Sequence, residues 1–155
     1  MDFHIAGLDP QPFAHLFGKS DAELAAAGVT RHRVDAFPCF PDRITLSDLP
    51  IGTTALLLNY EHQPAPTAYR ASHAIYLGED GAGRFDATNT IPQSLAVRLL
   101  SLRAFDATGM MRDAEVVDGS DAATVVRRML RDPANAYVHA HYVKRGCFAA
   151  TIERA

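Results

Sequence analysis

The stretch "NAYVHAHYVKRGCFAATIER", residues 135–154, consists of two β-prone runs joined by a short polar segment that contains one glycine. Aromatic and β-branched residues are frequent in both runs, which is typical of strands. Gly146 is the residue of the joining segment that takes the left-handed conformation without strain. The stretch therefore predicts a β-hairpin in which Val143 lies opposite Cys147.

Side chains alternate along a strand, so the first run divides its residues between two faces of the predicted sheet. The apolar face predicts a core layer of three cross-strand pairs, Tyr142 with Phe148, Ala140 with Ala150, and Val138 with Ile152. His139 and His141 share the other, more polar face with Cys147. A slip of one residue keeps the two histidines together but moves Cys147 to the opposite face.

A second hairpin of the same kind is predicted in "LLSLRAFDATGMMRDAEVV", residues 99–117, where Gly109 follows an Asp-Ala-Thr turn. The predicted cross-strand pairs are Asp106 with Met110, Arg103 with Asp113, Leu102 with Ala114, and Leu100 with Val116. One face of this hairpin then carries an ion pair, and the other face is largely apolar.

Between the two hairpins, "GSDAATVVRRMLRDP", residues 119–133, predicts a helix capped by Ser120 and ended by Asp132 and Pro133. Residues spaced three and four apart form an apolar stripe that predicts one face packed on a sheet. The stripe consists of Ala122, Val125, Val126, Met129 and Leu130.

The N-terminal part predicts a strand followed by two short helices. "DPQPFAHLFG", residues 9–18, has Asp9 as a cap and Pro10 at the first helical position, and "SDAELAAAG", residues 20–28, carries a capping box of Ser20 and Glu23. Further strands are predicted near residues 30–37, 53–60 and 73–78. The whole chain, residues 1–155, is expected to form a single globular domain of the α+β class. Its sheet is expected to be mostly antiparallel, with the C-terminal hairpin-helix-hairpin unit and short N-terminal helices.

Composition excludes several classes of function. The formal net charge is -3 with no basic stripe, which argues against nucleic-acid binding. No apolar run is long enough to span a membrane, and the N-terminal residues do not resemble a leader peptide, so a cytoplasmic protein is expected. Two cysteines form no disulfide framework. "GEDGAGRFD", residues 78–86, lacks the spacing of a phosphate-binding loop and predicts a flexible turn, so no nucleotide cofactor is expected.

His139 and His141 are candidate metal ligands and candidate catalytic groups. Two imidazoles at positions i and i+2 of a strand can converge on one ion, and nitrogen ligands suit zinc. Three interpretations remain open for this pair: a half-exposed face hydrogen-bonded to neighbours or water, a divalent-metal site, and acid–base or ligand contact. For Cys147, a small packing residue is favoured over a nucleophile.

A second set of candidates lies between the strands near residues 53–60 and 73–78. A loop of about a dozen residues is expected there, and loops of that length in compact domains often bind ligands. Glu61 and His62 are candidate catalytic groups, and the candidate ligand-binding residues are Tyr69, Arg70 and His73. Arg70 suits a carboxylate or phosphate. Arg43, in contrast, is expected to be a surface or ion-pair residue.

Four stretches resemble a bacterial family known as domain of unknown function 1203. They are "FPDRITLSDLPIGTTALLLNYEHQP", "AYRASHAIYL", "LRAFDATGMMRDAEVVDG" and "AYVHAHYVKRGCFAATIER", which together cover most of the chain. The resemblance implies no assigned reaction. It also implies that many members carry a cysteine where this chain has Asp42, whereas Gly146 and Cys147 match the family pattern. A mechanism that depends on a cysteine pair is therefore not expected here.

The sequence is compatible with three functions. The leading hypothesis is a small-molecule binding domain, with the 61–73 loop and the His139/His141 face around an anionic ligand held by Arg70. The second is an enzyme that uses these histidines for acid–base chemistry or for a divalent metal, with Glu61 as the carboxylate. The third is a non-catalytic protein that self-associates or binds another chain through an open sheet edge or face.

Overall fold

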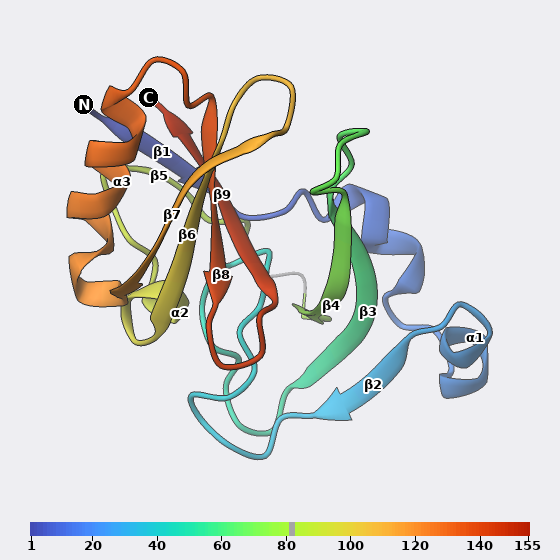
Figure 1. Cartoon of the computed structure of the whole chain (residues 1–155). Helices are drawn as coiled ribbons and strands as arrows, with labels where there is room; N and C mark the ends of the chain where they lie inside the picture. The colour runs from blue at the N-terminus through green and yellow to red at the C-terminus, as the bar shows by residue number, and fades with distance from the viewer. Residues whose placement is uncertain (81–82) are drawn as a thin grey trace.

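The computed structural model describes residues 1–80 and 83–155 and consists of two antiparallel sheets with helices around them (Figure 1). The larger sheet has six strands in the order β5-β1-β9-β8-β6-β7. Their bounds are β1 Phe3–Ala6, β5 Asp86–Thr88, β6 Leu99–Phe105, β7 Met111–Asp118, β8 Tyr137–Tyr142 and β9 Phe148–Arg154. The predicted turn at residues 78–86 includes Gly81 and Ala82, which lie outside the described residues.

The smaller sheet has three strands in the order β2-β3-β4, with β2 Thr30–Arg33, β3 Thr54–Gln63 and β4 Ala71–Gly78. The helices are η1 Gln11–Leu16, α1 Asp21–Ala26, α2 Gln93–Ala96, η2 Gly119–Asp121 and α3 Ala122–Arg131. The predicted α+β class, antiparallel pairing and short N-terminal helices are therefore confirmed. None of the helices in the described residues is long and apolar enough to cross a membrane.

The main core lies between α3 and the larger sheet. All five residues of the predicted apolar stripe on α3 are buried there, and they pack with Val138, Ala140 and Tyr142 of β8. The predicted cap is wrong in one detail, because a turn of 3-10 helix (η2) precedes α3 and Asp121 occupies the N-cap position instead of Ser120. The capping box of Ser20 and Glu23 at α1 is confirmed.

Both hairpins contain a bulge that the sequence analysis missed. In β6–β7 the backbone N–H of Asp106 donates to the carbonyl of Met110, as predicted next to the turn. Arg112 is then an extra residue, so Arg103 lies opposite Ala114 and not opposite Asp113. The partners of Leu102 and Leu100 are shifted by one residue in the same way, so that Leu102 lies opposite Glu115 and Leu100 opposite Val117. A turn specifies register only up to the first irregularity of the ladder.

In β8–β9 the extra residue is Ala149. Beyond it the predicted pairs hold, with Ala140 opposite Ala150 and Val138 opposite Ile152. Next to the turn the register is the slipped one, because His141 lies opposite Phe148 and the Tyr142 backbone N–H donates to the carbonyl of Cys147. The predicted Tyr142–Phe148 pair is therefore wrong. Phe148 lies on the histidine face, whereas Cys147 joins the core on the other face.

Three further predictions are corrected by the smaller sheet and its surroundings. The strand predicted over residues 30–37 ends at Arg33. The loop expected over residues 61–73 is shorter, because β3 continues to Gln63 and β4 begins at Ala71. Arg43, expected at the surface, is 1% exposed, and its Nε donates to the Phe148 carbonyl at 2.8 Å.

Candidate functional site

Three histidines from two sheets meet where the sheets face each other. His62 belongs to β3 of the smaller sheet, and His139 and His141 belong to β8 of the larger one. One ring nitrogen from each lies within 4.8 Å of the other two. We call these residues the three-histidine cluster.

Local structure explains how each imidazole reaches the cluster. His139 and His141 are two residues apart on one strand and therefore lie on one face. His62 is available because β3 extends past the predicted end of its strand and carries that residue toward β8. The distance between the ring centroids of His62 and His141 is 4.9 Å, and that between His62 and His139 is 5.9 Å.

Aromatic rings enclose the cluster. The ring of Phe148 stacks on His62 with centroids 5.3 Å apart and an interplanar angle of 4°, and it meets both strand β8 histidines edge-on. The rings of Phe105 and Tyr137 also pack against His139. As a result His139 is 4% exposed and His141 is 1% exposed. The open hypothesis of a half-exposed histidine face is therefore wrong, because the smaller sheet covers that face.

Each imidazole has one buried nitrogen without a hydrogen-bond partner in the described residues. His141 Nδ1 lies 3.0 Å from the carbonyl of Gly146, and because a carbonyl only accepts, Nδ1 carries the proton. Its Nε2 is buried and has no partner in the described part of the chain, and the same is true of Nδ1 in His62 and in His139. Buried polar atoms without partners are unfavourable, and an ion or water is a common explanation for them.

Burial also sets the charge of the cluster. Burial, together with the smaller effect of the positive charge of Arg103, lowers the pKa of His62 to about 4 and the pKa values of His139 and His141 to about 3. The three imidazoles are neutral at pH 7. A neutral imidazole is the form that binds a metal ion.

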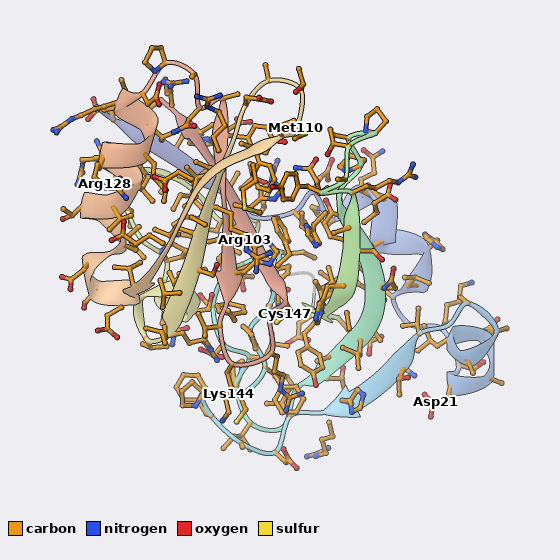
Figure 2. The ribbon with its side chains drawn as sticks, in the orientation of Figure 1. Asp21, Arg103, Met110, Arg128, Lys144 and Cys147 are labelled. Carbon is orange, nitrogen blue, oxygen red and sulfur yellow. The ribbon has the colours of Figure 1, made fainter. Side chains whose placement is uncertain are left out.

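Arg103 lies beside the cluster. In the β6–β8 register it is the partner of His139, so the two side chains share a face, and Figure 2 shows the Arg103 side chain extending toward the smaller sheet. Its Nε donates to Ser101 Oγ at 3.1 Å. None of the ion pairs in the described residues involves Arg103. Its charge is therefore available to an anion near the histidines.

A surface cavity of about 410 Å³ gives access to the cluster from outside. His62 and His139 line it together with Tyr137, Thr151 and Glu153. We call it the histidine cavity. Glu153 is exposed and lies on the next strand, at the wall of the cavity and outside the cluster.

The lowered pKa values predict a loss of stability in acid for the metal-free protein. Unfolded histidines bind protons below about pH 6.5, whereas the buried ones remain neutral down to about pH 4 or 3. The folded state thus binds fewer protons in this window, and the free energy of unfolding falls as the pH drops through it. The slope reaches up to about 1.4 kcal/mol per pH unit for each fully buried histidine.

Urea unfolding in the presence of a chelator at pH 7 and pH 5 measures this loss. The variant with His139→Asn and His141→Asn is expected to lose less stability between the two pH values than the parent protein. Equal losses in both proteins would show that these histidines do not cause the pH dependence.

The remaining predicted site residues are not members of the cluster. Glu61 and Arg70 form a surface ion pair at 3.1 Å, so the carboxylate expected near the histidines and the cation expected to hold a ligand are paired with each other. Tyr69 is 39% exposed and packs edge-on against Phe105. His73, opposite Tyr60 in the β3–β4 ladder, lines a separate cavity.

Two members of the site, Phe148 and Arg103, were not predicted from the sequence. Phe148 was assigned to the core face and Arg103 to an ion pair with Asp113, and each error follows from an undetected bulge. Asp113 instead pairs with Arg128 of α3 at 3.3 Å. The partial signal was the slipped register of the β8–β9 hairpin, which places Phe148 opposite His141.

The sequence also matches a known protein family. The model of the family described as a protein of unknown function (DUF1203) matches residues 39–154. The chain belongs to this family. The DUF1203 region contains the whole three-histidine cluster, whereas β1, η1, α1 and β2 precede it. No curated protein and no solved structure matches the chain.

Within the DUF1203 region, Asp42 has a structural role. Its buried carboxylate accepts hydrogen bonds from the backbone N–H groups of Ile44, Thr45 and Gly78. Cys39 is exposed, Cys147 is buried, and both are free thiols. The interpretation of Cys147 as a packing residue agrees with its place in the core.

Proposed function

We propose that this protein binds a divalent transition-metal ion through His62, His139 and His141 and holds a small anionic molecule on the free position of that ion. The observation that supports this most strongly is that one ring nitrogen from each of the three histidines lies within 4.8 Å of the other two, in a cluster where each imidazole has a buried nitrogen without a hydrogen-bond partner in the described residues. Nitrogen ligands of this kind suit zinc and its neighbours in the first transition series.

The number of ligands favours an open site. Structural zinc sites are usually closed by four protein ligands, whereas sites with three protein ligands leave a position for water or substrate. The histidine cavity leads to two of the three imidazoles, so this position faces solvent. The nitrogens lie within 4.8 Å of one another, and tetrahedral zinc needs about 3.4 Å, so metal binding requires the rings to move closer together.

The hydrogen bond from His141 Nδ1 to Gly146 supports the same function. Histidines that bind metals usually donate their other ring N–H to a carbonyl or carboxylate, which orients the ring and selects the tautomer. Here the turn glycine of the β8–β9 hairpin supplies that acceptor. The Nε2 of His141 has no partner in the described residues and is therefore available to a metal ion.

Charge around the cluster favours an anionic ligand in the free position. None of the residues in the cluster is a carboxylate, and Glu61 is paired with Arg70. A divalent ion beside the cation of Arg103 therefore needs a compensating negative charge. Hydroxide or the acidic group of a small molecule supplies it.

Acid–base chemistry by the free histidines is less favourable than metal binding. A general acid or base works best when its pKa is near the working pH. The pKa values of about 3 and 4 are far below neutrality because the rings are buried. A metal-bound water, in contrast, can reach a pKa near 7 in a site of this kind.

Cobalt(II) titration tests the proposal. Metal-free protein is expected to develop the visible absorption of low-coordinate cobalt, with an endpoint of one ion per chain. The His62→Asn variant is expected to lose the band, and His15→Ala, which removes an exposed histidine elsewhere, is expected to keep it. Absence of the band in the parent protein, or its retention in His62→Asn, would overturn metal binding.

The same cobalt protein tests the anion. Thiocyanate is expected to change the band in the parent protein, and Arg103→Gln is expected to need more thiocyanate for the same change. Arg112→Gln, at an exposed position of β7, is the matched control. If thiocyanate acts equally on all three proteins, Arg103 has no part in anion binding.

A further inference from the structure

A second cavity, of about 520 Å³, lies beside the turn of the β8–β9 hairpin and shares no lining residue with the histidine cavity. Its walls come from the segment before β3, from β3 and β4, and from the turn that carries Lys144 (Figure 2). We call it the arginine cavity. Its size is in the range of cavities that bind small organic molecules.

Basic side chains are concentrated in its lining. Arg43, Arg98, Lys144 and Arg145 all line the cavity, and the described residues around it include no aspartate or glutamate. Asp48 neutralises the charge of Arg98, because two guanidinium nitrogens of Arg98 donate to the Asp48 carboxylate at 2.8 and 2.6 Å. The positive charges of Arg43, Lys144 and Arg145 therefore have no carboxylate partner among the residues that line the cavity.

Arg43 is the least compensated of them. Its side chain is 1% exposed, and its hydrogen bonds go to the carbonyl oxygens of Pro41 and Phe148, which are neutral. No carboxylate pairs with it in the part of the chain that the structure describes. A buried charge without a counter-charge is unfavourable unless a ligand provides one.

The ring of Tyr142 holds the two arginines in place. The guanidinium carbon of Arg43 is 4.9 Å and that of Arg98 is 5.1 Å from the ring centroid, and the Tyr142 hydroxyl donates to Ser94 at 2.9 Å. Arginines stacked on a fixed aromatic ring are preorganised for an acidic group.

Apolar surface makes up the rest of the wall. Leu57, Tyr76, Leu99 and Val143 contribute side chains next to the basic ones. A cavity with an apolar wall and a few convergent charged groups suits a molecule that has an apolar body and an acidic end.

We infer that the arginine cavity binds a small organic anion, whose apolar body lies against Leu57 and Tyr76 and whose carboxylate or phosphate is held by Arg43 with Lys144 and Arg145. This site is separate from the proposed metal site and needs no metal ion. It also differs from the anion site expected at Arg70, which is paired with Glu61 on the surface.

Two fluorescent probes of similar shape test the inference with the metal-free protein. 8-Anilinonaphthalene-1-sulfonate carries an anionic group, and N-phenyl-1-naphthylamine is its uncharged counterpart. The anionic probe is expected to bind more tightly, and phenyl phosphate or benzoate is expected to displace it. The competitor that acts at lower concentration identifies the acidic group as phosphate or carboxylate.

Variants at the exposed turn test whether Lys144 and Arg145 bind the anionic group of the probe. The double variant Lys144→Gln, Arg145→Gln is expected to bind the anionic probe roughly tenfold more weakly, which corresponds to about 1.4 kcal/mol of binding free energy. Its affinity for the uncharged probe is expected to stay unchanged. Lys19→Gln with Arg131→Gln removes two charges elsewhere on the surface and is expected to change neither probe. Equal effects of the two double variants would overturn the role of the turn.

A larger side chain inside the arginine cavity tests whether the probes bind there. Ala74 lines the cavity and is exposed, so Ala74→Phe occupies the space without disturbing the core. It is expected to abolish binding of both probes while the circular dichroism spectrum and melting temperature stay unchanged. Undiminished probe binding in this folded variant, or equal affinity of the two probes for the parent protein, would refute the inference.

Discussion

Replacing Phe148 with alanine is expected to lower the free energy of unfolding by about 3–5 kcal/mol, the usual cost of deleting a buried phenylalanine ring. The ring is 2% exposed and contacts Tyr60 and His62 of the smaller sheet as well as His139 and His141 of its own. Its removal leaves a hole at the contact between the sheets. Because native stability is about 5–15 kcal/mol, a large share of it is lost.

Urea unfolding at pH 7 measures the effect of Phe148→Ala. Phe37→Ala is the matched control, because Phe37 is 56% exposed and its truncation is expected to cost no more than about 0.5 kcal/mol. Phe148→Leu keeps most of the buried volume and is expected to lie between the two. A loss below about 1 kcal/mol for Phe148→Ala would mean that this ring does not hold the sheets together.

Zinc is expected to stabilise the folded protein strongly. An ion that binds the folded state at about 100 times its dissociation constant raises the free energy of unfolding by about 2.7 kcal/mol. The gain comes from ligands of both sheets, because His62 and the pair on β8 are brought together only in the folded chain. Zinc binding thus opposes separation of the smaller sheet from the larger one.

Urea unfolding with and without zinc measures how much the ion raises the free energy of unfolding. This zinc increment is compared between the parent protein and the His62→Ala variant. His62→Ala is expected to lose most of the increment, whatever its stability without zinc, and His15→Ala is expected to retain it. A similar zinc increment in His62→Ala would place the ion elsewhere in the chain.

Local patterns predicted the α3 stripe and the two faces of β8 well. The apolar stripe of α3 repeats every three or four residues and needs no distant partner to be recognised. Val138, Ala140 and Tyr142 are in the core as predicted, because alternation along a strand is a local property. The two turns also follow from their glycines, Gly109 and Gly146, which both have positive φ.

The complete strand register was not predictable in the same way, because each hairpin holds one register near its turn and another beyond its bulge. Neither Arg112 nor Ala149 is a residue type that marks a bulge, and each is an extra residue in its strand. The pairing beyond the bulge depends on contacts of β6 and β9 with other strands of the sheet. Those contacts are distant in sequence, so turn chemistry carries no information about them.

The environment of Arg43 was also hidden from the sequence. The residue follows Pro-Asp in a segment rich in turn residues, where a surface position is the ordinary expectation. Its burial depends on the carbonyl of Phe148 and the ring of Tyr142, both near the other end of the chain. No local pattern reports such a contact.

Periodicity in the amino-acid order is enough to place His139 and His141 on one face of a strand opposite the core, because side-chain direction alternates whatever the rest of the chain does. Whether that face meets water or protein depends on the packing of the smaller sheet against it, which brings His62 onto the two imidazoles and onto the ring of Phe148. Packing of that kind is a sum of many weak contacts between distant segments. This packing combines the two histidines of β8 with His62 in a buried cluster and leaves Glu61 and Arg70 outside it.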